Sequence, residues 1–308
     1  MDAKELLRRY AAGEKDFTNV DLASANLERA KLRSANLSNA NLAGANLSNA
    51  NLTSVNLANA NLTETNLTNT ILEGIDLSNA NLTKADLSGA MVAGCLDRAD
   101  LTEANLSQAQ MFETNLNGTT LRAANLSGAY FSQCTAEITL NLSQANLKEA
   151  VLSEFYLPDA DLSGADLSGA WLEGTSLSDA NLSNVNFSGA NLIRADLSGA
   201  NLRGTNLRGA LYSSETGFSD EIDLSCAILI APGVNLSHVD LHGVRLTCLD
   251  LSRVNLSDAN LRGADLHGTN LRNADLRNTD LRDANLKDAN LNEAIFGNTI
   301  MPDGSVRN

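Results

Sequence analysis

The stretch ANLSNANLAGANLSNANL at residues 35–52 repeats the pattern A-(N/D)-L-(S/T/R)-X every five residues, and similar stretches fill most of the chain. This period matches neither the roughly 3.6 residues of an α-helical turn nor the roughly 2 of a free β-strand. In an extended chain, the central Leu and the small residue two positions before it can both point inward while the other three positions face water. Leu27, Leu47 and Leu67 are then expected to stack as one ladder.

The composition agrees with a narrow and uniform core. The chain has 308 residues, of which 43% are apolar, but only 4% are aromatic and only 3 are proline. A globular core of varied large side chains is therefore excluded. Ala25 and Ala45 leave space beside the Leu ladder, so larger side chains there would overpack it. The Asn or Asp between Ala and Leu can hydrogen-bond to nearby backbone and help the chain turn a corner.

The repeat resembles the pentapeptide-repeat family, and the opening LLRRYAAGEKDF (6–17) and closing NTIMPDGS (298–305) resemble its cyanobacterial members. The resemblance covers roughly nine-tenths of the chain. It implies an all-β fold, namely a right-handed quadrilateral parallel β-helix with four pentapeptides in each coil. It brings no agreed activity with it.

The pattern predicts five segments. Residues 1–14 form a short capping α-helix, because Asp2 and Glu5 make a capping box and Ala3, Leu6, Leu7 and Tyr10 share one face. Residues 15–212 form the pentapeptide-repeat β-helix, residues 213–233 an irregular excursion, residues 234–301 a continuation of the same solenoid, and residues 302–308 a C-terminal tail. The register slips at 92–96 and recovers at 136–142, which predicts β-bulges.

Charge and motifs exclude several function classes. The net charge is −15, which disfavours direct nucleic-acid binding because phosphate contacts need Lys and Arg. We find no apolar run long enough to span a membrane and no signal peptide, so a cytoplasmic protein without membrane association is expected. Glycine-rich phosphate loops, nucleophile elbows and Cys-His or Ser-His pairings are missing from the sequence. We therefore expect no enzyme, no catalytic residue and no cofactor.

One outward column of the predicted coils is apolar where polar residues are expected. Six of its eight positions are large and apolar, and at the two polar positions, Gln110 and Asn191, the next outward residue is apolar instead. The predicted partner-binding residues are Ile71, Met91, Phe112, Tyr130, Val151, Trp171, Ile193 and Leu211. Such a stripe fits an unidentified protein partner or a second copy of the chain. Alternatively, Phe218, Ile228 or Ile230 of the excursion folds back over it.

The cysteines and histidines carry weaker hypotheses. Cys226 and Cys248 are expected to stack one coil apart as free thiols, because a reducing cytosol and parallel side chains oppose a disulfide. Cys95 and Cys134 lie too far apart to bridge. His238, Asp240 and His242 alternate outward along one strand, but they lack an enclosing shell, so no metal site is predicted.

Two functions follow. The first is a non-catalytic scaffold, a protein-interaction or self-association rod that uses the apolar stripe. The alternative, implied by the family resemblance, is an acidic DNA mimic that binds or protects a type II topoisomerase. Residues 155–230 carry ten acids against three Arg, but residues 34–63 carry no charge, so continuous phosphate-like rows are not expected.

Overall fold

The computed structural model describes residues 1–136, 139–219 and 222–308. The chain divides into two compact units. The first comprises residues 1–211 and 215–227, and the second comprises residues 212–214 and 228–308. Each unit is built from the five-residue repeat.

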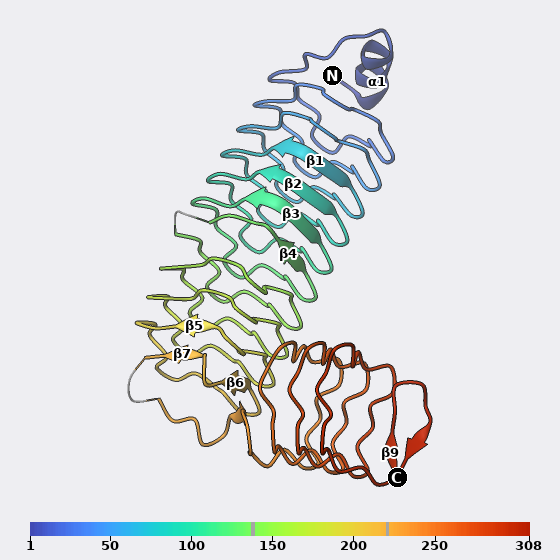
Figure 1. Cartoon of the computed structure of the whole chain (residues 1–308). Helices are drawn as coiled ribbons and strands as arrows, with labels where there is room; N and C mark the ends of the chain where they lie inside the picture. Colours follow the sequence, from blue (N-terminus) through green and yellow to red (C-terminus); the bar gives the residue numbers. More distant parts are fainter. Residues whose placement is uncertain (137–138, 220–221) are drawn as a thin grey trace. The chain divides into compact units, whose positions relative to one another are not determined.

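The first unit is a stack of coils (Figure 1). Its parallel bridges join residues 20 positions apart, such as Asp21 to Asn41 and Asn41 to Asn61. Four pentapeptides therefore close one coil and bring equivalent residues into register. The predicted β-helix is confirmed.

The corners explain why the repeat turns every five residues. The last residue of each repeat adopts a left-handed conformation, as at Asn39 with φ 57° and Gly44 with φ 63°. Asn46 Oδ1 accepts a hydrogen bond from the backbone N–H of Ser48 at 3.1 Å, and equivalent Asn and Asp residues repeat this contact. The predicted corner role of Asn and Asp is therefore confirmed.

The Asn side chains also connect successive coils. Asn41 Nδ2 donates to Asp21 Oδ1 at 2.9 Å, and Asn61 Nδ2 donates to Asn41 Oδ1 at 3.2 Å. An Asn can donate and accept at once, whereas an ionised Asp can only accept. Asp therefore fits where the next coil supplies an Asn donor.

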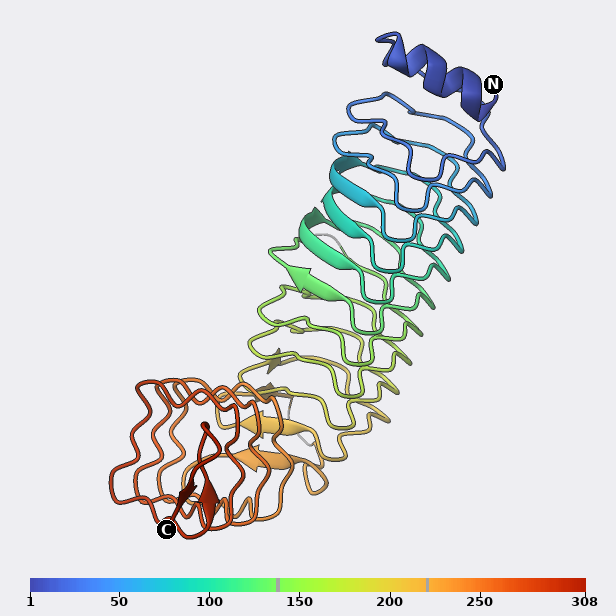
Figure 2. The same cartoon turned by 90° about the vertical axis from the view of Figure 1, so that its right-hand side faces the viewer.

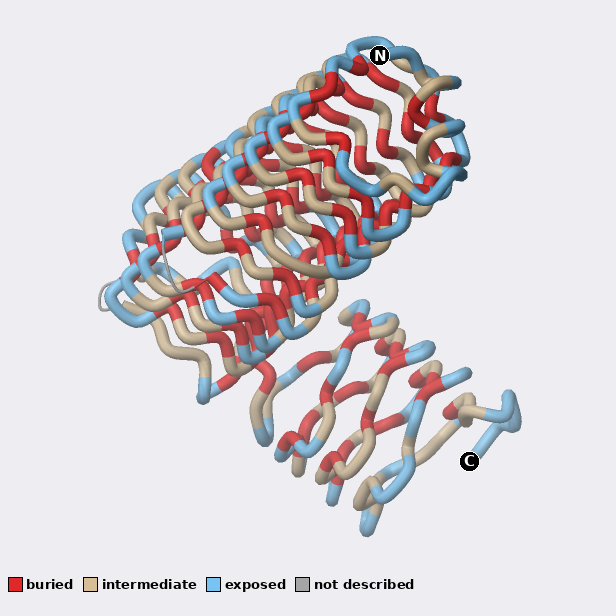
Figure 3. The backbone as a smooth tube through the Cα atoms, turned by 90° about the horizontal axis from the view of Figure 1, so that it is seen from above, coloured by how far each residue is buried: buried red, intermediate tan, exposed pale blue. Residues whose placement is uncertain are grey.

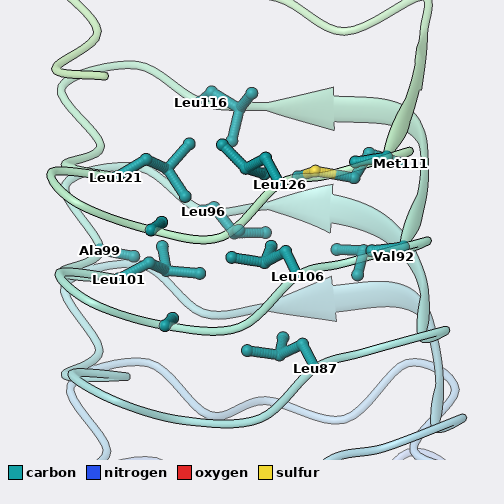
Figure 4. Packing of buried hydrophobic residues seen from close by; sticks show 14 of the residues in the cluster. Leu87, Val92, Leu96, Ala99, Leu101, Leu106, Met111, Leu116, Leu121 and Leu126 are labelled. Carbon is teal, nitrogen blue, oxygen red and sulfur yellow. The ribbon is translucent and has the colours of Figure 1, made fainter. Parts of the chain in front are cut away.

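The core consists of stacked inward side chains. Leu87, Leu106 and Leu126 lie above one another in three successive coils (Figure 4), and all three are buried. Buried positions line the inside of the coils and exposed ones the outside (Figure 3). Phe131 and Phe155 replace Leu and Ala in the interior of two successive coils, and their ring centroids lie 5.5 Å apart.

Longer strands occur in one part of the first unit. A four-stranded parallel sheet contains β1 (Ile71–Asp76), β2 (Met91–Cys95), β3 (Gln110–Asn115) and β4 (Tyr130–Ser132). Two pairs of shorter strands follow along the chain. They are β5 (Asp196–Leu197), paired with β7 (Gly217–Phe218), and β6 (Leu211–Ser213), paired with β8 (Ile228–Ile230).

A register shift lies inside this sheet. The pairing shifts between Glu73 and Ile75 of β1, opposite Gly94 of β2. Gly94 has φ 138°, and a Cβ added there would lie 2.2 Å from the Ile75 carbonyl oxygen. The predicted irregularity at 92–96 is thus a β-bulge that requires glycine. The compensating one at 136–142 includes residues 137 and 138, which lie outside the described residues.

A helix covers the first coil. The helix α1 (Ala3–Ala11) lies across the N-terminal end of the stack (Figure 2), and Asp2 accepts a hydrogen bond from the N–H of Glu5 at 2.8 Å. Leu6 is buried, and Ala3 and Tyr10 pack against the core. The prediction that Leu7 shares this buried face is wrong, because Leu7 is 37% exposed. Four apolar residues form a wider arc than one flat coil end can cover.

The second unit repeats the same register, with parallel bridges from Asn235 to Asn255 and from Asn255 to Asp275. Its tail folds back, because β10 (Val306–Arg307) pairs antiparallel with β9 (Thr299–Ile300). The turn between them contains Gly304 at φ 81°. That residues 234–301 continue the solenoid of the first unit stays a prediction. Across the described parts of both units, no helix has the length and apolar character to cross a membrane.

Candidate docking surface

The backbone register places the apolar positions in one column. Bridges and strand pairs join Ile71, Met91, Gln110, Tyr130, Val151, Trp171, Asn191 and Leu211 in that order. Phe112 lies two residues after Gln110 on β3 and pairs with Ser132. Side chains up to 140 residues apart in the chain therefore lie along one wall of the first unit.

The exposed part of this column is shorter than the sequence predicts. Met91 and Tyr130 are 37% and 41% exposed, and Ile71, Phe112, Val151 and Trp171 are half-buried. Ile193 and Leu211 are 0% and 5% exposed, so the prediction that they belong to an exposed surface is wrong. We define the apolar stripe as Ile71, Met91, Phe112, Tyr130, Val151 and Trp171.

A segment of the excursion contacts the coil that contains Ile193. Thr216 Oγ1 donates to the Leu192 carbonyl at 2.8 Å, and the Arg194 guanidinium contacts Glu215 at 3.1 Å and Glu173 at 3.2 Å. The five-residue pattern gives the direction of a side chain but not what a non-repeating segment places beside it. This explains why the sequence overestimated the length of the exposed surface.

The apolar stripe contains a groove and a ring contact. The Phe112 and Tyr130 rings lie 5.7 Å apart between centroids, tilted by 51°. A groove of about 220 Å³ beside them is lined by Glu73, Met91, Val92, Ala93, Phe112 and Glu113. Its size suits one apolar side chain, and carboxylates stand in its lining.

Sequence reasoning missed these carboxylates. Glu73, Glu113 and Glu154 are exposed and follow the inward residues Leu72, Met111 and Leu152 on the same wall. Glu113 and Glu154 occupy equivalent positions two coils, or 41 residues, apart, whereas Glu73 pairs with Ala93 and lies one position nearer the inward residue than they do. The signal is readable once the coil length is known. The candidate site therefore combines the apolar stripe with an acidic edge, which consists of Glu73, Glu113 and Glu154.

The excursion residues that were expected to cover the apolar stripe lie in different units. Phe218 of β7 pairs with Leu197 of β5, so it lies in the column that follows the stripe's column along the coil. Ile228 and Ile230 of β8 belong to the second unit. Their folding over the apolar stripe stays a prediction.

The cysteines are distributed over both units of the chain. All four cysteines are free, and Cys226 and Cys248 are exposed. The Cys226 carbonyl accepts from Gly209 N in the first unit, whereas Cys248 N donates to the His267 carbonyl in the second. Their stacking stays a prediction. Burial raises the pKa of the Cys134 thiol, which opposes thiolate formation there.

Metal ligands do not cluster in the described parts of the chain, where no group of three His, Cys, Asp or Glu could hold an ion. Asp240 instead accepts hydrogen bonds from the His242 N–H at 3.1 Å and from Asn260 Nδ2 at 2.8 Å. Asp240 is thus part of a corner and an inter-coil ladder.

Comparisons with known proteins address the repeat directly. The family described as pentapeptide repeats matches eight segments, namely residues 13–39, 30–69, 60–96, 99–135, 141–179, 174–209, 230–258 and 259–298. No curated protein matches the chain.

Several solved structures are similar in sequence. HetL, a pentapeptide repeat protein involved in heterocyst differentiation regulation from the cyanobacterium Nostoc sp. strain PCC 7120, is 32% identical over 100% of both chains, with a TM-score of 0.18. Rfr23 from the cyanobacterium Cyanothece 51142 is 28% identical over 45% of this chain and 63% of its own, with a TM-score of 0.20. The protein alr5209 from Nostoc PCC 7120 is 30% identical over 44% of this chain and 84% of its own, with a TM-score of 0.16. The eight matched segments and the full-length identity together establish that the chain belongs to the pentapeptide-repeat family.

Proposed function

We propose that the protein is a non-catalytic scaffold that binds another protein through the apolar stripe. The observation that carries this proposal is the run of large apolar side chains through six successive coils. Five of them lie in a column that elsewhere holds Lys31 and Asn51, and Phe112 lies two residues after that column. Monomers seldom expose contiguous apolar surface on this scale without using it. Tyr130 and Trp171 belong to the residue types that anchor protein interfaces.

Folding does not account for the stripe. Asn51 Oδ1 accepts from the Thr53 N–H at 3.1 Å and from its hydroxyl at 2.8 Å, which ties its corner together. An apolar residue at the same position makes neither hydrogen bond and leaves carbon surface in water. A role outside the fold is therefore favoured.

A binding experiment tests the proposal. In the variant Tyr130→Asn with Trp171→Asn, the repeat's own corner residue replaces both aromatics. The control variant is Tyr156→Asn with Ile295→Asn, which removes two apolar side chains that are 57% and 51% exposed outside the stripe. Tagged forms of all three proteins are used to capture partners from an extract of the source cell, and captured proteins are purified and titrated.

The proposal expects the partner to be lost from the stripe variant and kept by the control variant. Equal capture and equal affinity of both variants would show that the apolar stripe does not bind the partner. Circular dichroism of each variant shows that the coils are intact.

The DNA-mimic alternative draws on the net charge of −15. The corner columns interrupt their carboxylates, because Asn181 and Asn201 follow Asp161, and Asn186 and Asn206 follow Asp166. A gyrase supercoiling assay discriminates between the two functions. Inhibition that weakens steeply with added salt favours the mimic, and unchanged supercoiling favours the scaffold.

A further inference from the structure

The edge of the apolar stripe carries one sign of charge. Glu73, Glu113 and Glu154 are exposed on the side of the wall that follows the inward residues, and none forms an ion pair with a described residue. The corner that precedes the stripe carries mainly hydroxyl side chains, as at Ser88, Ser107 and Ser127. A partner that covers the stripe must therefore meet carboxylates along one side.

The spacing of these carboxylates favours one shape of partner. Along the stack, each step from Glu73 to Glu113 and from Glu113 to Glu154 crosses two coils, or about 10 Å at ~4.8 Å per coil. Glu113 and Glu154 occupy equivalent corner positions, and Glu73 lies one position nearer the apolar stripe. Seven residues of an α-helix advance about 10.5 Å and return to nearly the same face. Three residues of an extended strand also advance about 10 Å, but they end on the opposite face. A helix lying along the column can meet all three carboxylates from one face.

The groove supports the same arrangement. It lies between Glu73 and Glu113 and is floored by Val92 and Ala93 of the intervening coil, with Met91 and Phe112 beside it. An apolar side chain seated there would place the residues around it within reach of both carboxylates. Ala93 is the small residue that leaves this space.

A second copy of the chain is a poor occupant. If two identical walls face each other, each acidic edge meets either the other acidic edge or the Ser-rich corner. Between Ile71 and Trp171 that corner offers Lys148 as its cation, beside Glu149. A self-pairing would thus leave carboxylates unpaired or opposed.

We infer that the occupant of the apolar stripe is an amphipathic α-helix of a partner protein, with Lys or Arg at every seventh residue beside its apolar face. This inference rests on the proposed docking function and specifies the partner's chemistry.

The test uses the full-length protein and three synthetic peptides without tryptophan. The first peptide is helical, with Leu on one face and Lys at every seventh position beside it. The second replaces those Lys with Glu, and the third alternates Leu and Lys in a strand pattern. Trp171 is the single tryptophan of the chain, so its fluorescence reports directly on occupation of the stripe.

The variants separate charge from apolar contact. The variant with Glu73→Gln, Glu113→Gln and Glu154→Gln neutralises the acidic edge. The control variant with Glu64→Gln, Glu103→Gln and Asp159→Asn removes the same charge from corners of other walls, where these residues adopt positive φ as Glu113 and Glu154 do. We expect the edge variant to bind the Lys helix about tenfold more weakly, since each exposed pair contributes modestly. The control variant should change affinity by less than about twofold.

Every other outcome overturns the inferred partner or one of the features assigned to it. Equal affinity for the Lys and Glu helices, or equal weakening by both charge variants, overturns the acidic-edge recognition while leaving apolar docking intact. Equal affinity for the strand peptide overturns the helical partner. A light-scattering mass that doubles with protein concentration in the parent, and not in the Tyr130→Asn, Trp171→Asn variant, assigns the stripe to self-association. Failure of every peptide to shift Trp171 fluorescence overturns the inferred partner, whereas the extract experiment tests the docking function separately.

Discussion

Asn51 and Ile71 occupy the same outward column of the first unit, one coil apart, and their inward neighbours Leu52 and Leu72 are both buried. Outside, Asn51 binds its own corner, whereas Ile71 begins β1 and the apolar stripe. The interior of the coil is therefore indifferent to what the outward position carries. This independence lets a repeat built for folding carry a surface built for binding.

The largest expected effect comes from breaking the interior that both regions share. Leu106 is buried between Leu87 and Leu126 (Figure 4), so Leu106→Ala leaves a cavity within a continuous stack. We expect a loss of about 2–5 kcal/mol in the free energy of unfolding. Urea unfolding followed by circular dichroism measures it. A loss below that of an exposed substitution such as Tyr156→Asn would contradict the central role of the stack.

The bulge in the stripe sheet gives the next effect. Gly94→Ala places a Cβ against the Ile75 backbone, 2.2 Å from its oxygen and 2.8 Å from its nitrogen. Because backbone cannot move aside as a side chain can, we expect a cost of at least about 3 kcal/mol. Gly189→Ala is the control, since no atom lies within 4 Å of its added Cβ and Ala123 already adopts φ 56°. Thermal unfolding of both variants should separate them, and equal melting temperatures would refute the steric account.

A third prediction concerns the hydrogen bonds between Asn and Asp side chains of successive coils, which the apolar stripe lacks. Asn41→Asp removes the donor to Asp21 and sets two carboxylates against each other. We expect about 1–2 kcal/mol of destabilisation at neutral pH. Asn49→Asp adds the same charge at an exposed corner with φ 58° and should cost less. Urea titrations compare the two, and equal losses would mean that net charge rather than the ladder sets the cost.

The smallest effect concerns charge in the second unit. A hydrogen bond from Arg277 holds the pKa of Asp275 below its usual 3.8. A depressed pKa stabilises the folded state above the unfolded value, and this contribution disappears as pH falls through the folded value. Since Arg277 is largely exposed, we expect less than about 1 kcal/mol, lost below about pH 4. Asp275→Asn should flatten this part of the pH profile, and an unchanged profile would contradict the assignment.

The repeating residues made most of the fold predictable, because period and side-chain type fix direction at each position. Leu27 and Leu47 are buried, Asn46 turns its corner, and Asp2 caps the first helix as the sequence indicated. The failures lie where the repeat stops or where a second surface matters. Ile193 was expected to be exposed because the repeat does not describe the excursion, in which Glu215 contacts Arg194 and Thr216 donates to the Leu192 carbonyl.

The candidate site was predictable to a similar degree. The column from Ile71 to Trp171 follows from counting coils, and its register agrees with the count. The acidic edge of Glu73, Glu113 and Glu154 follows from the same count, but it was overlooked because charged residues are common at the outward positions of the repeat, whereas large apolar ones are not. The repeat predicts in which direction a side chain points. What binds there depends on how well the partner's surface fits, and the period of the sequence carries no information about the partner.

The exposure of Trp171 in the free protein decides whether the apolar stripe is open to a partner. We predict that the isolated chain, at low concentration, gives red-shifted Trp171 emission that acrylamide quenches readily and that does not change on dilution. Emission that is blue-shifted and protected from acrylamide at every concentration would show that the stripe is already covered by the chain itself, and it would contradict a surface open to a partner.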